Sequence, residues 1–294
     1  MTLSEEVRRH CAEVARTAQH VRIDLDVAAD VRPAPPPALD PESHYLEGEP
    51  EDVALYLLTL DSINFGSGWF PRLAKRVVEG RVLSGYFTVA WALADQFRAE
   101  GPWRARQLRA IDTSTVADVL HQAPDLELMG LYAQALRALG GFLGDRPALA
   151  AVGRARGSAN RLARRLASEM PMFDDVGFYK RALITASDLA LAGVAGFDDL
   201  DTLPIFADNL VPHVLRCDGV LRYDAHLAAH IDAGRRLPMG PAEREIRACA
   251  VHACELIAQR TGVPARALDG WLWNRGQEPG YKVRPRHRTT TVFY

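Results

Sequence analysis

The sequence contains few cysteines, and none of them belongs to a metal-binding pattern. Cys11, Cys217, Cys249 and Cys254 are the four that occur, and no two form a CxxC pair. Structural zinc sites need ligands at closer and repeated spacing, so we expect no metal site. Such cysteines are typical of reduced, partly buried thiols in a cytoplasmic protein.

Long apolar runs and an excess of one charge are also missing. No stretch approaches the ~20 continuous apolar residues that cross a bilayer, and residues 1–6 are polar and acidic where a signal peptide is basic and then apolar. We therefore expect a cytoplasmic protein with no membrane partner. The net charge is −2, which gives no positive field for a nucleic-acid backbone, whereas a few local cations can still bind one phosphate.

The sequence-level motifs of common catalytic sites are absent as well. There is no Walker loop, no GxGxxG fingerprint, no HExxH and no GxSxG, and we expect no cofactor. Strand patterns are confined to residues 22–27 and 289–293. Neither belongs to a repeating strand–helix series, which disfavours an α/β fold.

Helical periodicity is abundant. The 294 residues are 48% hydrophobic and 24% charged, enough for a core without disulfides. We expect an all-α, mainly helical fold in a single domain, 1–294, with a proline-rich surface connector at 32–42 that cannot be helical. The predicted helices begin after Thr2 and at Pro50, and continue at about residues 72–79, 84–99, 114–121, 125–140, 145–151, 158–168, 175–192, 206–216 and 242–260.

A glycine-rich loop follows the helix that begins at Pro50. Asp61, Asn64, Phe65 and Trp69 bring a carboxylate, an amide and aromatic rings together there. Such a loop can hold a planar ligand between a ring and polar side chains. It can equally be a buried loop whose polar groups bond to its own backbone, and the local sequence does not decide between the two.

A second unusual stretch runs from residue 172 to residue 182. Asp174 or Asp175 can cap the following helix, which is the simpler interpretation. Tyr179, Lys180 and Arg181 are less expected, because cations oppose the dipole at the start of a helix. A bound anion would relieve that conflict, although these side chains can also point into water.

Two further stretches carry charge among apolar residues. Asp208 lies in an apolar run, where an unpaired charge is costly. It can cap the helix that contains Pro212, or form an internal network with His213 and Arg216. The last stretch, 280–294, is rich in cations and fits a solvated basic tail, but its apolar end favours inward packing.

At these stretches the sequence resembles the queuosine salvage proteins, the queuosine 5′-phosphate N-glycosylase family. The matching segments keep their order from residue 60 onward, which makes the set more specific than any one of them. They are Leu60–Pro71, Ser84–Phe87, Phe178–Ala182, Phe206–Asp208 with Val211–Pro212, Gly219–Tyr223, and His287–Thr289 with Tyr294.

The resemblance implies a helical fold similar to that of DNA glycosylases, and release of queuine from its 5′-nucleotide. Queuine is a 7-deazaguanine with an aminomethyl-linked cyclopentenediol, so a carbon replaces the N7 that an enzyme would otherwise protonate. Catalysis then depends on stabilising an oxocarbenium-like sugar and positioning water. Our hypothesis gives this role to Asp208, with water as the nucleophile and no metal.

The same hypothesis assigns the substrate contacts. Asp61, or one acid of the Asp174–Asp175 pair, would meet the cationic amine of queuine. The remaining candidates are Ser62 and Asn64 for the pyrimidine edge; Phe65, Trp69 or Phe87 for its face; Lys180 with Tyr179 or Arg181, and His287, Arg288 or Tyr294, for the 5′-phosphate; and His213 as a further substrate-binding residue.

Three other functions remain open at this stage. A base-excision glycosylase acting on nucleic acid would need a broad basic face, against which the net charge of −2 argues. A non-catalytic helical binding module would tolerate loss of Asp208. Hydrolysis of the unphosphorylated nucleoside would differ only in the contacts to the phosphate. We expect a small nucleotide as the partner and no stable nucleic-acid complex.

Overall fold

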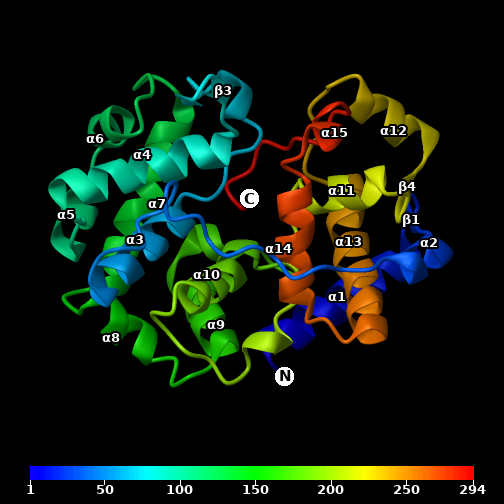
Figure 1. The fold of residues 1–294 in the computed structure, drawn as a ribbon, viewed down its shortest axis with the longest axis horizontal. Coiled ribbons are helices and arrows are strands. Elements are labelled where there is room, and N and C mark those ends of the chain that lie inside the picture. Colours follow the sequence, from blue (N-terminus) through cyan, green and yellow to red (C-terminus); the bar gives the residue numbers. More distant parts are fainter.

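The computed structural model covers residues 1–294, and the chain is mainly helical, as the sequence predicts (Figure 1). None of its helices is both long and apolar enough to span a membrane. In chain order the helices are α1 (Leu3–Thr17), α2 (Leu25–Asp30), α3 (Pro50–Ser62), α4 (Gly85–Glu100), α5 (Ala105–Ala110), α6 (Thr113–Val119), α7 (Glu127–Leu143), α8 (Ala148–Gly153), α9 (Ala159–Glu169), α10 (Lys180–Leu191), α11 (Val211–Cys217), α12 (Ala225–Asp232), α13 (Pro241–Thr261), α14 (Ala265–Arg275) and α15 (Pro279–Lys282), with short 3-10 turns at Phe70–Arg72, Pro171–Phe173 and Leu200–Thr202.

Four short strands form two antiparallel pairs. Strand β1 (Val21–Ile23) pairs with β4 (Leu221–Tyr223), and β2 (Val77–Val78) pairs with β3 (Arg81–Val82). The first pair joins segments about two hundred residues apart in sequence, and the second is a local hairpin.

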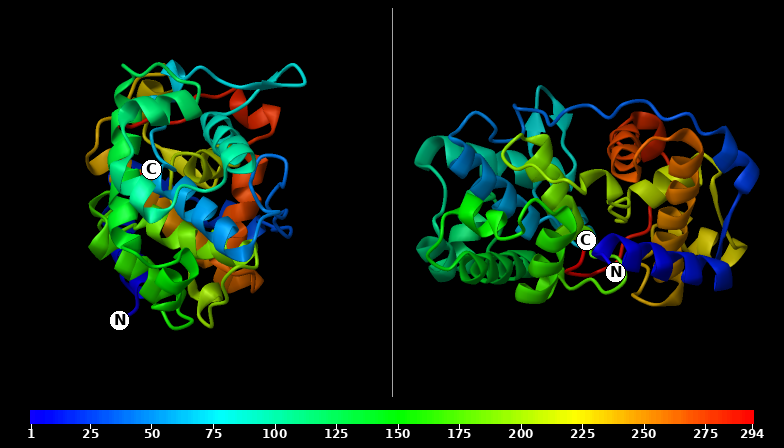
Figure 2. Two further views of the ribbon diagram at one scale, coloured as in Figure 1. Left: turned by 90° about the vertical axis from the view of Figure 1, so that its left-hand side faces the viewer. Right: turned by 90° about the horizontal axis from the view of Figure 1, so that it is seen from below.

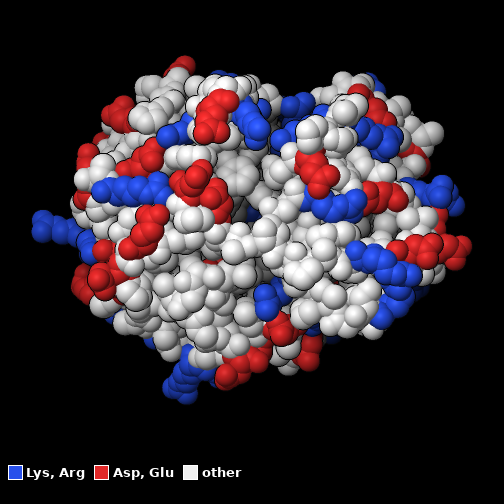
Figure 3. Space-filling model, viewed as in Figure 1, with Lys and Arg blue, Asp and Glu red and all other residues white.

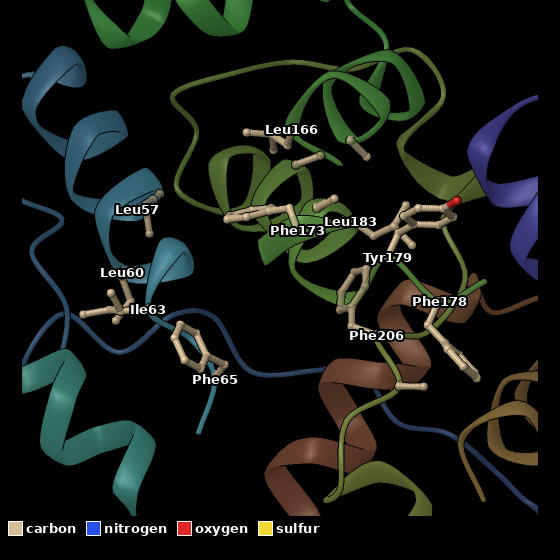
Figure 4. Close-up of a cluster of buried hydrophobic side chains, with 14 of the residues drawn as sticks. Leu57, Leu60, Ile63, Phe65, Leu166, Phe173, Phe178, Tyr179, Leu183 and Phe206 are labelled. Carbon is tan, nitrogen blue, oxygen red and sulfur yellow. The ribbon is translucent and has the colours of Figure 1, made fainter. Parts of the chain in front are cut away.

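The helices form two groups that meet along one side. Helices α3 to α10 make the first group, and α1, α2 and α11 to α15 make the second (Figure 1). A continuous cluster of 79 buried apolar residues runs through both. Figure 4 shows part of this core, with Leu57 and Leu60 of α3, Leu183 of α10 and Phe206 of a neighbouring loop.

Local signals fixed several helix ends correctly. The side chains of Thr2 and Glu5 form a capping box at the start of α1. Helix α13 starts at Gly240-Pro241 and stops at Gly262, whose φ of +75° suits the left-handed C-terminal position.

The predicted helix at 72–79 is wrong. Residues 76–83 instead contain the β2–β3 hairpin, because β-branched Val77 and Val78 favour a strand. Glu79 and Gly80 have φ values of +49° and +77°, the two positive values that a tight hairpin turn of type I′ requires.

Two predicted helices begin later than expected. Helix α10 starts at Lys180 rather than at 175, because Gly177 and Tyr179 both have positive φ. Helix α11 starts at Val211 rather than at 206, with Pro212 in its first turn. The residues that precede α10 and α11 are therefore loops. These two loops lie beside each other and next to the first helix group.

The two predicted strands fare differently. Strand β1 ends at Ile23, because Asp24 then caps α2. Residues 289–293 form no strand. Helices α2, α5, α12, α14 and α15 and strand β4 were not predicted from the sequence.

The connector at 32–42 contains no helix or strand, and we call it the strap. It crosses one face of the molecule from α2 to the start of α3, passing in front of α14 (Figures 1 and 2). Arg260 donates a hydrogen bond to the Val31 carbonyl (2.6 Å) at one end, and Arg98 donates to the Pro41 carbonyl (2.8 Å) at the other. The strap is therefore held at both ends.

The segment 284–294 packs inward between the two helix groups, where Figure 1 marks the C-terminal end. Tyr294 is 3% exposed, and its carbonyl accepts a hydrogen bond from the Gly66 N–H (3.0 Å). A Cβ added at Gly68 would lie 2.6 Å from the Thr289 carbonyl oxygen, so only glycine allows this approach. Of the two alternatives for this stretch, inward packing is the observed one.

Candidate functional site

A cavity lies where the two helix groups meet. Its walls come from the loop after α3, from α4, α10 and α14, from the loop before α11, from the strap and from the segment 284–294. Three kinds of side chain face it, namely aromatic rings, carboxylates and cations. They include Phe65, Phe70, Tyr86, Phe87, Phe206, Trp273 and Tyr294; Asp40, Asp188, Asp208 and Asp269; and Lys180, Arg266 and Arg286.

Asp208 lies in the cavity wall just before α11. Its Oδ1 accepts hydrogen bonds from the backbone N–H groups of Leu210 (2.7 Å) and Val211 (3.2 Å). Asp208 therefore caps α11 and also faces the cavity. Both are possible because the cap uses only Oδ1 of the carboxylate. His213 and Arg216 do not join it, since they bond to the Tyr281 carbonyl (2.8 Å) and to Asp232 (2.9 Å).

Asp269 of α14 faces the same part of the cavity. Its Oδ1 accepts a hydrogen bond from the Phe206 N–H (2.8 Å), which ties α14 to the loop that carries Asp208. Burial, together with the charge of Asp208, raises the pKa of Asp269 to about 8. Asp269 is therefore a neutral carboxylic acid at pH 7 beside Asp208.

Lys180 is buried at the start of α10. Its Nζ donates to the Asn64 carbonyl (3.2 Å), and Lys180 and Asn64 both line the cavity. Burial lowers the pKa of Lys180, and the charges of Asp208 and Asp61 oppose that shift. Lys180 thus connects the stretch 172–182 to the glycine-rich loop after α3.

Asp61 lies behind this lysine in the last turn of α3. It is fully buried, and neither carboxylate oxygen has a hydrogen-bond partner. Burial raises the pKa of Asp61 to about 7, against the opposing charge of Lys180. The neighbouring Ser62 hydroxyl donates to the Leu58 carbonyl (2.7 Å) within the helix. Neither side chain faces the cavity.

Other predicted binding residues hold the walls in place. The Arg181 guanidinium donates to the carbonyls of Ser62 (2.6 Å) and Val292 (2.7 Å), between the rings of Phe65 and Phe173. The Trp69 Nε1 donates to Glu127 (2.9 Å), away from the cavity. Arg181 therefore joins α3, α10 and the segment 284–294.

The Asp174–Asp175 pair separates into an exposed and a buried residue. Asp174 is exposed, whereas Asp175 is 5% exposed and forms a two-pronged ion pair with Arg247 of α13. Tyr179 also turns away, because its hydroxyl donates to Glu6 of α1 (2.9 Å), and Figure 4 shows that hydroxyl directed toward α1. None of the three lines the cavity.

The predicted residues near the C-terminal end divide in the same way. Tyr294 lines the cavity, and its hydroxyl donates to Glu243 (2.8 Å). His287 is buried without a hydrogen-bond partner for either ring nitrogen, and burial lowers its pKa to about 3. Arg288 donates to the Gly234 carbonyl (3.1 Å). Arg286, which the sequence analysis did not select, is the cation of this segment that faces the cavity.

Asp188, Asp269, Trp273 and Arg247 were missed as well. Asp188 lies in the apolar sequence of α10, and an acid in such a run was the signal that had selected Asp208. Arg247 donates from Nε to the Ala207 carbonyl (2.9 Å), directly beside Asp208. It acts as a positioning residue for that loop.

The fold and site define a class of protein, namely a mainly helical protein with a cavity lined by aromatic rings, carboxylates and cations. The profile of the family described as "Queuosine salvage protein" matches residues 43–294. The chain belongs to the queuosine salvage protein family.

Curated relatives support the same assignment. A protein of Sphaerobacter thermophilus named queuosine 5′-phosphate N-glycosylase/hydrolase is 34% identical over 96% of this chain and 95% of its own length. A protein of Schizosaccharomyces pombe with the same name is 27% identical over 82% of this chain and 81% of its own. One of Dictyostelium discoideum is 38% identical over 40% of each chain.

Proposed function

We propose that this chain is a hydrolase of N-glycosyl bonds that cleaves queuosine 5′-phosphate into queuine and ribose 5-phosphate. The observation that carries the proposal is the placement of Asp208 in one cavity with Lys180, Arg286 and several aromatic rings. The charge of Asp208 is the strongest favourable influence on the protonated forms of both Lys180 and Arg286. An acid beside an anion-binding pair fits a ribose held next to its 5′-phosphate.

Asp208 has the arrangement that the chemistry requires. As the C1′–N bond breaks, its electron pair leaves with the base and positive charge develops on the ribose. The water oxygen bonds to C1′, and the proton that it releases passes through the Asp208 carboxylate to the departing base, which leaves as neutral queuine. Two backbone N–H groups fix Oδ1 beforehand, so the carboxylate need not reorient as charge develops.

Asp269 sets the charge of this part of the cavity. Because its pKa is raised to about 8 by burial, it adds no second negative charge at neutral pH. Asp208 then acts alone on the developing cation. Hydrogen bonding of Asp269 to the Phe206 N–H also keeps the Asp208 loop against α14.

The 5′-phosphate binds between Arg286 and Lys180 in this proposal. A guanidinium can donate two parallel hydrogen bonds to phosphate, and a lysine adds a point charge. Of the phosphate candidates from the sequence, Lys180 and Tyr294 face the cavity. Arg181, Tyr179, His287 and Arg288 support the walls through the contacts described above.

The base occupies the aromatic part of the cavity. Asn64 and Phe65 line it from the loop after α3, and Phe87 lines it from α4. Phe65 is held edge-on by Tyr132, with ring centroids 5.0 Å apart. We assign the pyrimidine edge to Asn64 and a ring face to Phe65 or Phe87.

We propose a free nucleotide rather than a nucleic acid as the substrate. On the face drawn in Figure 3, cationic and anionic side chains are interspersed, and no continuous basic surface favours a polymer there. A cytoplasmic location is part of the same proposal, and the buried free thiols of Cys11, Cys249 and Cys254 are compatible with it.

The test is incubation of the purified protein with queuosine 5′-phosphate, followed by chromatography for free queuine. We expect stoichiometric queuine and ribose 5-phosphate, slower release from the nucleoside, and none from queuosine-containing tRNA. Binding of the nucleotide without release of base would contradict the proposal and favour a binding module. Release from tRNA alone would favour a nucleic-acid glycosylase.

A further inference from the structure

Asp188 of α10 is an acid that the proposed chemistry leaves unused. It is 7% exposed and faces the cavity, and its carboxylate receives no hydrogen bond from the protein. Burial raises its pKa well above the usual range, with a further contribution from the charge of Asp61. A buried acid without a partner is unfavourable unless a ligand supplies a cation or a donor.

Aromatic rings surround this end of the cavity. Tyr86 and Phe87 of α4 pack edge-on against Trp273 of α14, with centroids 5.3 and 5.6 Å from it. Asp188 lines the same cavity as these rings, and after burial its charge contributes most to raising the pKa of the Tyr86 phenol. Aromatic faces with an adjacent carboxylate are a favourable site for an ammonium group.

The strap closes the same end. Pro33, Pro36 and Leu39 are half-buried, while the residues between them are mostly exposed. A three-residue repeat of burial is typical of a polyproline II helix with one face against the protein. A Cβ added at Gly270 of α14 would lie 3.0 Å from the Pro36 Cβ, so the strap rests closely on α14.

The middle of the strap is suited to form a wall. Its prolines have no N–H groups, so they leave fewer backbone donors to satisfy at an apolar surface. Pro36 and Leu39 line the cavity. These residues precede the segment matched by the family profile, which begins at residue 43.

The cavity carries opposite charges at two places along α10. Lys180 and Asp188 both face it from this helix, about 12 Å apart along the helix axis. A ligand with an anionic group near Lys180 and Arg286 and a cationic group near Asp188 matches both. Queuosine 5′-phosphate has its phosphate and its secondary amine at opposite ends.

We infer that Asp188 and the Tyr86–Trp273 rings bind the cationic amine of the base, and that strap residues Pro36 and Leu39 form the wall against its cyclopentenediol ring. This inference rests on the proposed function and extends it to substrate selection. It moves the amine contact from Asp61 and the Asp174–Asp175 pair to Asp188.

A series of three nucleotides separates the contributions. The first is 7-deazaguanosine 5′-phosphate, which lacks the amine; the second carries an aminomethyl group at C7; and the third is queuosine 5′-phosphate. The measurement is kcat/KM for base release from each. The wild-type protein should improve at both steps of the series.

Asp188→Asn is nearly isosteric and removes only the charge. We expect it to lower kcat/KM about 10- to 100-fold for the two amine-bearing nucleotides, as for loss of a charge-assisted hydrogen bond, and less than about twofold for 7-deazaguanosine 5′-phosphate. An equal loss on all three nucleotides would overturn the amine assignment.

Leu39→Ala tests the strap wall independently. Removal of part of a contact to an apolar ring should lower kcat/KM about 3- to 10-fold for queuosine 5′-phosphate only. Pro35→Ala is the matched control, because Pro35 is exposed and does not line the cavity; it should match the wild type on every substrate.

The failures of the two proposals are distinguishable. If the wild-type protein releases base from none of the three nucleotides, the proposed function is wrong. If it releases base from all three equally well, the function stands and the inference about Asp188 and the strap is overturned. Thermal unfolding of each variant checks that the comparison is made on folded protein.

Discussion

Two clusters of buried charge lie side by side in this protein, and they differ in how fully the protein neutralises them. In the first, Arg247 bonds to Asp175 and to the Ala207 carbonyl, and its guanidinium lies 3.9 Å from the Phe178 ring centroid and 4.4 Å from that of Tyr294. We call these residues the Arg247 network. Its charges are satisfied internally, and it holds the Asp208 loop in position.

The second cluster lines the cavity and is incomplete by comparison. One oxygen of Asp208 is used by the backbone, and the Asp188 carboxylate receives no hydrogen bond from the protein. Buried charge that the protein leaves unpaired is typical of sites that a ligand completes. In this comparison the satisfied charges of the Arg247 network hold the scaffold, and we propose that the incompletely paired carboxylates that face the cavity select the substrate.

The largest effect is expected from breaking the Arg247 network. Arg247→Met leaves Asp175 as a buried acid without its partner, which should lower the free energy of unfolding by about 3–5 kcal/mol. Arg222→Met is the matched control, since Arg222 pairs with Asp24 at the surface and should cost less than about 1 kcal/mol. Urea unfolding measures both. If both variants lost the same free energy of unfolding, the Arg247 network would not have the scaffold role that we assign to it.

Asp208→Asn should show the opposite pattern. It keeps the side-chain oxygen that caps α11 but removes the charge, so stability should stay within about 1 kcal/mol of wild type. We expect kcat to fall about 10²- to 10³-fold, since the interaction acts on charge that develops only in the transition state. Single-turnover rates and a nucleotide-binding assay test this. Wild-type turnover would exclude Asp208 from catalysis.

Arg286→Ala should weaken phosphate binding. KM for the 5′-nucleotide should rise about 10- to 100-fold, with little change for the nucleoside, because only the nucleotide has the charged group. Arg288→Ala is a matched control, since Arg288 bonds to the Gly234 carbonyl and does not line the cavity. A nucleoside loss as large as the nucleotide loss would place Arg286 in the scaffold instead.

The smallest expected effect, taken per pH unit, concerns the pH dependence of stability. Asp269 has a pKa of about 8 in the folded protein because it is buried, against 3.8 for the ordinary group. Between these values the folded state holds a proton that the unfolded chain has lost, so the free energy of unfolding falls as pH rises from about 4 to 8. Asp269→Asn removes this loss.

The advantage of the variant in the free energy of unfolding should grow by up to about 1.4 kcal/mol for each pH unit between about 4 and 8, and it should disappear near pH 4. Urea midpoints at several pH values measure the difference. A gain independent of pH would mean that the effect comes from packing rather than from titration.

Parts of the fold were predictable because their determinants are local. Thr2 with Glu5 and Gly240 with Pro241 fix helix ends within a few residues. The hairpin at 76–83 was not predicted, because a glutamate such as Glu79 is not a typical residue for a turn position with positive φ. Helix α14 was not predicted either, although it supplies Asp269 and Trp273 to the cavity.

Site residues could be predicted from the sequence only where they lie in a segment that resembles the family. Asp208 and Lys180 lie in segments that resemble the family, and both face the cavity. Arg181 lies next to Lys180 in the same segment, yet it holds the scaffold. One residue along a helix turns a side chain by about 100°, and which of two neighbouring cations meets a ligand depends on packing that the local sequence does not encode.

Gly68 shows how far the control of this site extends beyond its charged groups. The Thr289 carbonyl occupies the space where any side chain at position 68 would begin. Even a single methyl group would push away the segment that carries Arg286 and Tyr294. A position without any side chain therefore sets where Arg286 and Tyr294 lie in the cavity wall, although Gly68 itself does not line the cavity.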